Sequence, residues 1–187
     1  PNGDLIASND DWQVQTPPSL TISSELGLPN PTDAGVLLDL PAGAYTLTLS
    51  SVGNLGLGLV GVDAIETAGT QTAIKLINIS TRAPILGGTG DVIAGFMISG
   101  TGTQSVIVRG WGLDSGVDTK LTVQKFPSGE VIVINDNWQT QVAPAITIPS
   151  VYQMPKETDA AVLLNLPAGA YTATLESVGM KGLGLIG

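Results

Sequence analysis

The feature that most constrains this chain is an internal repeat, because residues 1–61 align without a gap to residues 127–187. The two copies share 36 of 61 residues, about 59 %, at an offset of 126 positions. The run LPAGAYT, from Leu40 to Thr46, recurs unchanged from Leu166 to Thr172. A solenoid unit usually takes roughly 20–50 residues, so a period of 126 indicates an array of whole domains.

Composition favours an all-β protein. Charged residues make up 12 % and apolar residues 43 % of the chain, which is too apolar and too weakly charged for disorder. The 24 glycines and 12 prolines interrupt almost every stretch that is long enough for a helix. Between these breaks lie short runs rich in leucine and β-branched residues, which indicate strands.

These runs predict tandem antiparallel β-sandwich domains with a 126-residue period. From residue 71 onward there are about nine of them, a number typical of a sandwich. Turn sequences such as Gly100-Thr101-Gly102 and Pro167-Ala168-Gly169 separate them. The expected strands are 73–80, 92–99, 105–110, 120–126, 131–135, 145–148, 161–166, 170–177 and 183 onward. Alternation along them predicts inward side chains at Val106, Val108, Leu121, Val123, Leu163, Tyr171 and Leu183.

The repeat also predicts domain boundaries. Residues 1–66 are expected to form the C-terminal part of one β-sandwich repeat, and the small polar residues 67–70 a linker. Residues 71–187 are expected to form the next repeat, with its last strand truncated. The chain is therefore expected to be a window on a longer tandem array.

Charge and residue usage disfavour several function classes. The net charge of −9 offers no basic face for nucleic acid. The absence of histidine removes the commonest general base and the commonest transition-metal ligand, and cysteine is also absent. The longest apolar runs, such as 36–40 and 92–98, are far too short to insert in a membrane. We therefore expect no enzyme, no catalytic residue and no cofactor.

The most site-like motif is Asn9–Trp12 (NDDW), which returns as Asn135–Trp138 (NDNW). Acidic and amide oxygens at a turn are ligands that Ca²⁺ accepts. However, the third residue changes from Asp to Asn between copies, and Asp39 likewise becomes Asn165. A ligand that supplies charge should resist such a change. We therefore expect no metal site; the polar residues cap a turn while the tryptophan packs over the end of the sandwich.

Other candidate sites have structural explanations. Gly88-Thr89-Gly90-Asp91 lacks the lysine and the following helix of a phosphate-binding loop. Arg82 and Arg109 are expected to hold loops through carbonyl groups or Asp91. Asn78-Ile79-Ser80 is a glycosylation sequon, but it falls in an expected strand. The carboxylates common to both copies are interpreted as turn and solubility residues rather than an acid–base pair: Asp4/Glu130, Asp10/Asp136 and Asp33/Asp159.

The order of motifs resembles a tandem β-sandwich repeat of large secreted bacterial surface proteins. Residues 76–82 (LINISTR), 88–96 (GTGDVIAGF) and 105–109 (SVIVR) are similar to that family's N-I-S-T-R-G, G-T-G-D, G-G-F and V-L-I-R motifs. The family's N-D-D-W box and P-G-A-Y-T-A turn follow, and both occur twice here. One departure is that its R-A-x-G-P-S-L stretch reads RGWGL at 109–113. The resemblance implies an extracellular tandem β-module without an established activity.

Two function classes remain. The first is a structural repeat module of an extracellular filament or surface fibre, assembling head to tail with identical neighbouring subunits or repeats. The second is an adhesin or carbohydrate-binding repeat with a surface glycan as partner and calcium as a candidate ligand. The loops that differ most between copies, 25–28 and 151–154, argue against one shared binding loop. Residues 1–61 hold only the later strands of a sandwich, so we expect neighbours to cover their open edges.

Overall fold

The computed structural model describes residues 4–54, 56–65 and 77–187. The chain divides into two compact units, Pro1–Lys75 and Leu76–Gly187, and each is described by itself. The predicted linker 67–70 lies outside the described residues.

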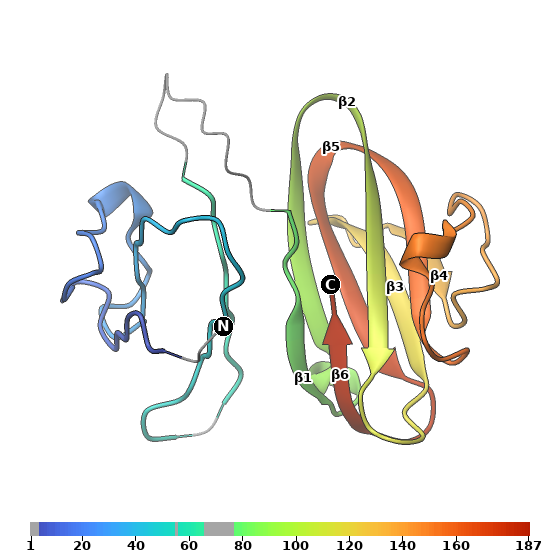
Figure 1. Ribbon diagram of the computed structural model, residues 1–187, viewed down its shortest axis with the longest axis horizontal. Helices are drawn as coiled ribbons and strands as arrows, with labels where there is room; N and C mark the ends of the chain where they lie inside the picture. Colours follow the sequence, from blue (N-terminus) through green and yellow to red (C-terminus); the bar gives the residue numbers. More distant parts are fainter. Residues whose placement is uncertain (1–3, 55, 66–76) are drawn as a thin grey trace. The chain divides into compact units, whose positions relative to one another are not determined.

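The second unit is an all-β fold built from one antiparallel sheet (Figure 1). Its six strands lie in the order β1-β6-β2-β5-β3-β4. Two short 3₁₀ turns, η2 (Gly88–Gly90) and η3 (Ser150–Tyr152), complete the unit. The strands are β1 (Thr81–Ile85), β2 (Val92–Gly112), β3 (Thr119–Phe126), β4 (Val131–Asn135), β5 (Ala160–Ser177) and β6 (Gly182–Ile186).

Strands β2 and β5 are long because they remain paired through two predicted breaks. Their register runs from Val92↔Leu175 to Gly110↔Ala160, with an irregularity between Ile98 and Thr103. The glycine turn of β2 and the proline-glycine turn of β5 lie opposite each other there. Both ribbons reverse direction at this place (Figure 1), so the sheet curls around its own core. The two turns therefore bend a continuous strand pair instead of ending it.

The core lies on the inner face of this curled sheet. Of the predicted inward side chains, Val108, Leu121, Val123 and Tyr171 are buried, and Val106 packs partly buried against them. The prediction is wrong for Leu163 and Leu183, which are only partly buried, whereas Leu164 and Ile186 are core residues. Leu163 belongs to a continuous apolar run and packs on a separate small cluster with Ile148 and Met154. Apolar side chains on both faces of a strand hide the alternation that identifies the core face.

The remaining strand predictions differ in outcome. β4 has the predicted bounds, whereas 145–148 contributes only the isolated bridge Ile146↔Leu163. Residues 77–80 of the predicted strand 73–80 are not in a strand, and 73–76 lie outside the described residues. β1 was not predicted because its sequence TRAPI contains Pro84, which lacks an N–H. An edge strand tolerates proline, and β1 is at the edge of this sheet.

The first unit repeats local features of the second, 126 residues earlier. The bridge Leu20↔Leu37 corresponds to Ile146↔Leu163, and the 3₁₀ turn η1 (Ser24–Leu26) corresponds to η3. Beyond this bridge, no strand forms among the described residues of this unit. The local folding of the two copies is therefore alike, while their sheet pairing differs.

Candidate functional site

The loop that carries the repeated Asn-Asp-Asn-Trp motif begins at the end of β4, where Asn135 is buried. Its side-chain amide donates to the carbonyl oxygens of Asn137 and Thr140, at 3.1 and 2.9 Å. Its side-chain oxygen accepts from the backbone N–H of Ala161 in β5, at 3.0 Å. Asn135 therefore ties the loop to the sheet.

Trp138 and Gln141 complete the attachment of this loop. The Trp138 indole N–H donates to the carbonyl of Lys156 at 3.0 Å, and its ring packs beside Ile148. The Gln141 amide donates to the carbonyls of Trp138 and Ala161, at 2.6 and 2.9 Å. Asn135 and Gln141 thus hold this turn by donating to its carbonyl groups, and the tryptophan packs on the small cluster with Ile148.

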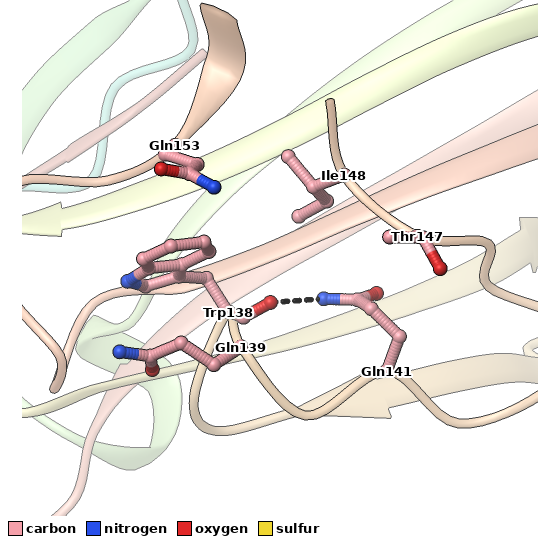
Figure 2. Close-up of a pocket in the computed structure, with 6 residues that line it drawn as sticks. All are labelled: Trp138, Gln139, Gln141, Thr147, Ile148 and Gln153. Atoms are coloured by element: carbon pink, nitrogen blue, oxygen red, sulfur yellow. Dashed lines mark hydrogen bonds between the residues drawn. The ribbon is translucent and has the colours of Figure 1, made fainter. Parts of the chain in front are cut away.

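A shallow, open cavity of about 430 Å³ lies over this loop. Figure 2 shows the Trp138 ring on one wall and the Gln141 amide bonded to the Trp138 carbonyl. Its lining residues are Trp138, Gln139, Gln141, Thr147, Ile148 and Gln153. An aromatic ring next to amide and hydroxyl groups can contact a small polar ligand.

The first unit makes the same loop contacts. The Asn9 amide donates to the carbonyls of Asp11 and Val14, at 3.0 and 2.8 Å, and the Trp12 indole donates to Asn30 O at 3.1 Å. Each of these bonds has its counterpart 126 residues later. The loop is therefore a repeated structural element of both units.

Two carboxyl groups of the second unit, Asp118 and Asp159, have pKa values above their ordinary value. Asp159 is buried: one oxygen accepts the Gly112 N–H at 2.9 Å, while Oδ2 has no partner among the described residues. This burial raises the pKa of Asp159 above its ordinary value. Burial also raises the pKa of Asp118, and the charges of Asp136 and Asp159 raise it further. Both carboxyl groups therefore take up a proton at a higher pH than an ordinary aspartate does. The sequence did not reveal this property.

Metal ligands do not gather in the part of the chain that the structure describes. No group of three or more Asp or Glu side chains there is arranged to hold an ion. In the first unit, Asp33 instead accepts from the backbone and side chain of Asn30, at 3.2 and 3.1 Å. The Asp33 carboxylate therefore stabilises its own loop.

The two arginine side chains do not make the predicted bonds to Asp91 among the described residues. The Arg109 guanidinium lies over the ring of Trp111, 4.8 Å from its centroid, and this places a cation on an aromatic face. Its backbone pairs with Gly187 through bonds of 2.8 and 3.0 Å. Arg82 is exposed on β1. No bond between either arginine and Asp91 occurs among the described side chains.

Asn78 of the glycosylation sequon lies in an exposed segment without strand structure. The prediction that it falls in a strand was therefore wrong. The sequon is exposed, as an asparagine that accepts a glycan must be.

The largest difference between the copies is in the exposure of matching apolar side chains. Leu49 is 49 % exposed and Tyr45 is 45 % exposed, whereas their counterparts Leu175 and Tyr171 are 0 % and 3 % exposed. In the second unit β2 and β3 pair with β5, and the inner side chains of these strands lie together in the core. The positions 126 residues before β2 and β3 fall outside the sequence. We call the uncovered surface the open face; its residues are Val36, Leu40, Tyr45, Leu47, Leu49 and Val60.

Tyr45 on the open face already has the orientation of its counterpart. Its hydroxyl donates to the Pro41 carbonyl at 2.8 Å, as the Tyr171 hydroxyl does to Pro167 at 2.8 Å. In the second unit the Tyr171 ring also stacks on Phe96, with centroids 5.4 Å apart. Tyr45 thus keeps the hydroxyl bond of Tyr171, and no stacked ring on Tyr45 is found among the described residues.

Comparison of the chain with protein-family models, curated proteins and solved structures gives no match. Among the described residues, none of the helical elements is long and apolar enough to cross a membrane.

Proposed function

We propose that this protein is a structural repeat module of an extracellular filament or surface fibre, in which neighbouring repeats assemble head to tail. The observation that supports the proposal is the gapless repeat at a 126-residue interval, in which both copies make the same loop hydrogen bonds.

The residue usage and the sequence pattern support this role. A gapless repeat supplies similar surfaces at a regular interval, which a linear polymer requires. The chain contains no histidine or cysteine, and its low charge and many small polar residues are common in surface proteins. Each repeat is proposed to be a β-sandwich module of an extracellular array, in line with the resemblance to bacterial surface repeats.

The test measures how length depends on repeat number. One or two further copies of residues 62–187 are added after Gly187, which reproduces the junction at Gly61. We expect electron microscopy to show rods that lengthen by the same increment for each added copy. A particle length that does not increase with the number of copies, or that increases by irregular amounts, would contradict a fibre module.

An adhesin or carbohydrate-binding repeat is the second candidate, favoured by the cavity beside Trp138. Its tryptophan face and amide groups suit a sugar ring, and the same loop recurs at Trp12. If this function holds, a glycan array should give binding that Trp138→Ala removes. Calcium dependence of that binding is tested by adding a chelator.

A further inference from the structure

We infer that the cavity beside Trp138 is a binding site for a neutral, hydroxyl-rich sugar ring, and that Gln153 at its rim sets which sugar it takes. The inference deepens the second candidate function and does not depend on the fibre role. The cavity volume of about 430 Å³ lies within the range of roughly 300–1,000 Å³ that small-ligand sites occupy. All its lining residues belong to the second unit.

The surroundings of the cavity are polar without being charged. Among the described residues, none that lines it carries a charge, although the chain has 16 acidic and 7 basic residues. An ionic ligand would therefore find no opposite charge there to offset the water that it loses on binding. A neutral polar ligand does not meet this cost.

Three exposed side chains of the lining can both donate and accept hydrogen bonds: Gln139, Thr147 and Gln153. None of them takes part in the bonds that Asn135, Trp138 and Gln141 make to hold the loop. An amide offers a donor and an acceptor, and a hydroxyl offers both on one oxygen. Sugar hydroxyls have the same double capacity. Figure 2 shows Gln139 and Gln153 on either side of the Trp138 ring, with Thr147 across from it.

Trp138 supplies an aromatic surface on which the C–H face of a sugar ring can pack. Its indole N–H donates to the Lys156 carbonyl at 3.0 Å and its ring packs beside Ile148, so its orientation is fixed before a ligand binds. A preset surface loses little conformational freedom on binding. Gln141 is a positioning residue, because its amide donates to the carbonyls of Trp138 and Ala161 and its Oε1 is buried.

The first unit retains the residue types of this site with one exception. Five of the six lining residues, two Gln and one each of Trp, Thr and Ile, recur 126 positions earlier, whereas Gln153 becomes Gly27. A Cβ added at Gly35 would lie 3.2 Å from both Trp12 Cβ and Ile22 Cδ1, so these side chains lie together as their counterparts do in the second unit. The base of the site is therefore common to both copies, and its rim is not.

The exchanged residue changes the space beside the tryptophan. A Cβ added at Gly27 would lie 2.7 Å from Trp12 Cη2, so the glycine backbone lies against the edge of the ring. Both rim residues have extended backbone, with φ of −63° at Gly27 and −60° at Gln153. Gln153 therefore brings a side chain to the place where Gly27 leaves the ring edge open. We expect the two sites to prefer different sugars.

A proline-rich peptide is the nearest alternative ligand, because it also packs on aromatic side chains. Such peptides lie along grooves lined with aromatic residues. This cavity has one aromatic ring, Trp138, among its described lining residues. The single ring with neighbouring amide and hydroxyl groups favours a sugar.

The test follows the indole N–H signals of the whole chain by NMR while neutral tetrasaccharides of hexoses or pentoses are added. The chain has three tryptophans, whose signals are assigned by replacing each in turn with Phe. We expect a neutral tetrasaccharide to shift the Trp138 signal in a saturable way. Trp111 does not line the cavity, and its signal should not shift. A tetrasaccharide of uronic acids, added as the charged control, should leave the Trp138 signal unchanged.

Thr147→Val tests the polar contacts, because it removes one hydroxyl at nearly constant volume and leaves the loop bonds in place. It should weaken saccharide binding at Trp138 by roughly two- to tenfold, the equivalent of about one hydrogen bond. Thr174→Val is the matched control, since Thr174 lies in β5 and does not line the cavity. This control should leave the affinity unchanged.

Exchange of the rim residues tests specificity. Gln153→Gly should give the Trp138 signal the order of preference among the tetrasaccharides that Trp12 shows in the unsubstituted chain. Gly27→Gln should make the opposite change at Trp12. Orders of preference that are equal in the two units, or that these substitutions leave unchanged, would overturn the role of the rim.

The remaining outcomes concern the site itself. No saturable shift of Trp138 with any neutral tetrasaccharide, an equal shift with the uronic acid tetrasaccharide, or a larger shift with a proline-rich peptide would overturn the inference. Binding that Thr147→Val and Gln153→Gly leave unchanged would place the sugar elsewhere and overturn it as well. Rods in the array experiment without saccharide binding would leave the fibre module standing. Saccharide binding without rods would leave the site standing and remove the fibre.

Discussion

The central energetic prediction concerns Leu175 and its counterpart Leu49, which share a sequence position but not an environment. Leu175 is fully buried, and its methyl carbons lie against Gly110 and Gly184: a Cβ there would be 2.3 and 3.0 Å away. Glycines have no side chain that can move into the space left by Leu175→Ala. The cavity therefore persists, and we expect the second unit to lose about 3–5 kcal/mol of unfolding free energy.

Hydrogen exchange followed by mass spectrometry measures both units in one sample. For Leu175→Ala, the slowest amides of β3 and β5 should exchange about 100- to 5,000-fold faster, since 1.4 kcal/mol corresponds to a factor of ten. The matched control Leu49→Ala removes a half-exposed side chain and should change exchange in the first unit by less than about fivefold. Equal effects of the two substitutions would refute the reasoning, because they would place both leucines in the same environment.

Three further predictions concern the second unit. Gly110→Ala should destabilise it in urea unfolding by about 1–3 kcal/mol, and combination with Leu175→Ala should cost less than the sum, since both act on one contact; simple additivity would argue against that contact. Because burial raises the pKa of Asp159, the folded state binds more protons than the unfolded state between the ordinary and the raised pKa, and stability falls as the pH rises through that window. Asp159→Asn should therefore gain stability relative to the unsubstituted protein as the pH rises through that window, and a pH-independent difference in unfolding free energy would count against this. Asn135→Ala leaves buried loop groups without partners and should lower the unfolding free energy of the second unit by about 1–3 kcal/mol. Asn9→Ala is the matched change in the first unit. If neither change lowers thermal stability, other contacts hold the loop.

The sequence by itself determined the features that depend on neighbours along the chain. The gapless repeat requires the same loop in both copies, and the hydrogen bonds of Asn9 and Asn135 are alike. Turn residues and the β-branched run 131–135 likewise identified β4 with its bounds. Such contacts span few residues, so local identity is enough to reproduce them.

Tertiary structure decided what these copies do with the same residues. Residues 160–177 form the strand β5, whereas the matching residues 34–51 form no strand. The strands that pair with β5 are β2 and β3, which are distant from it in sequence. The joining of two predicted strands into β2 was equally hidden, because its glycine turn is held by pairing across the sheet to β5. Sheet hydrogen bonds and burial need a partner surface, and no window of local sequence contains that partner. For this reason Leu175 is a core residue and Leu49 is not, although their sequence neighbours are nearly the same.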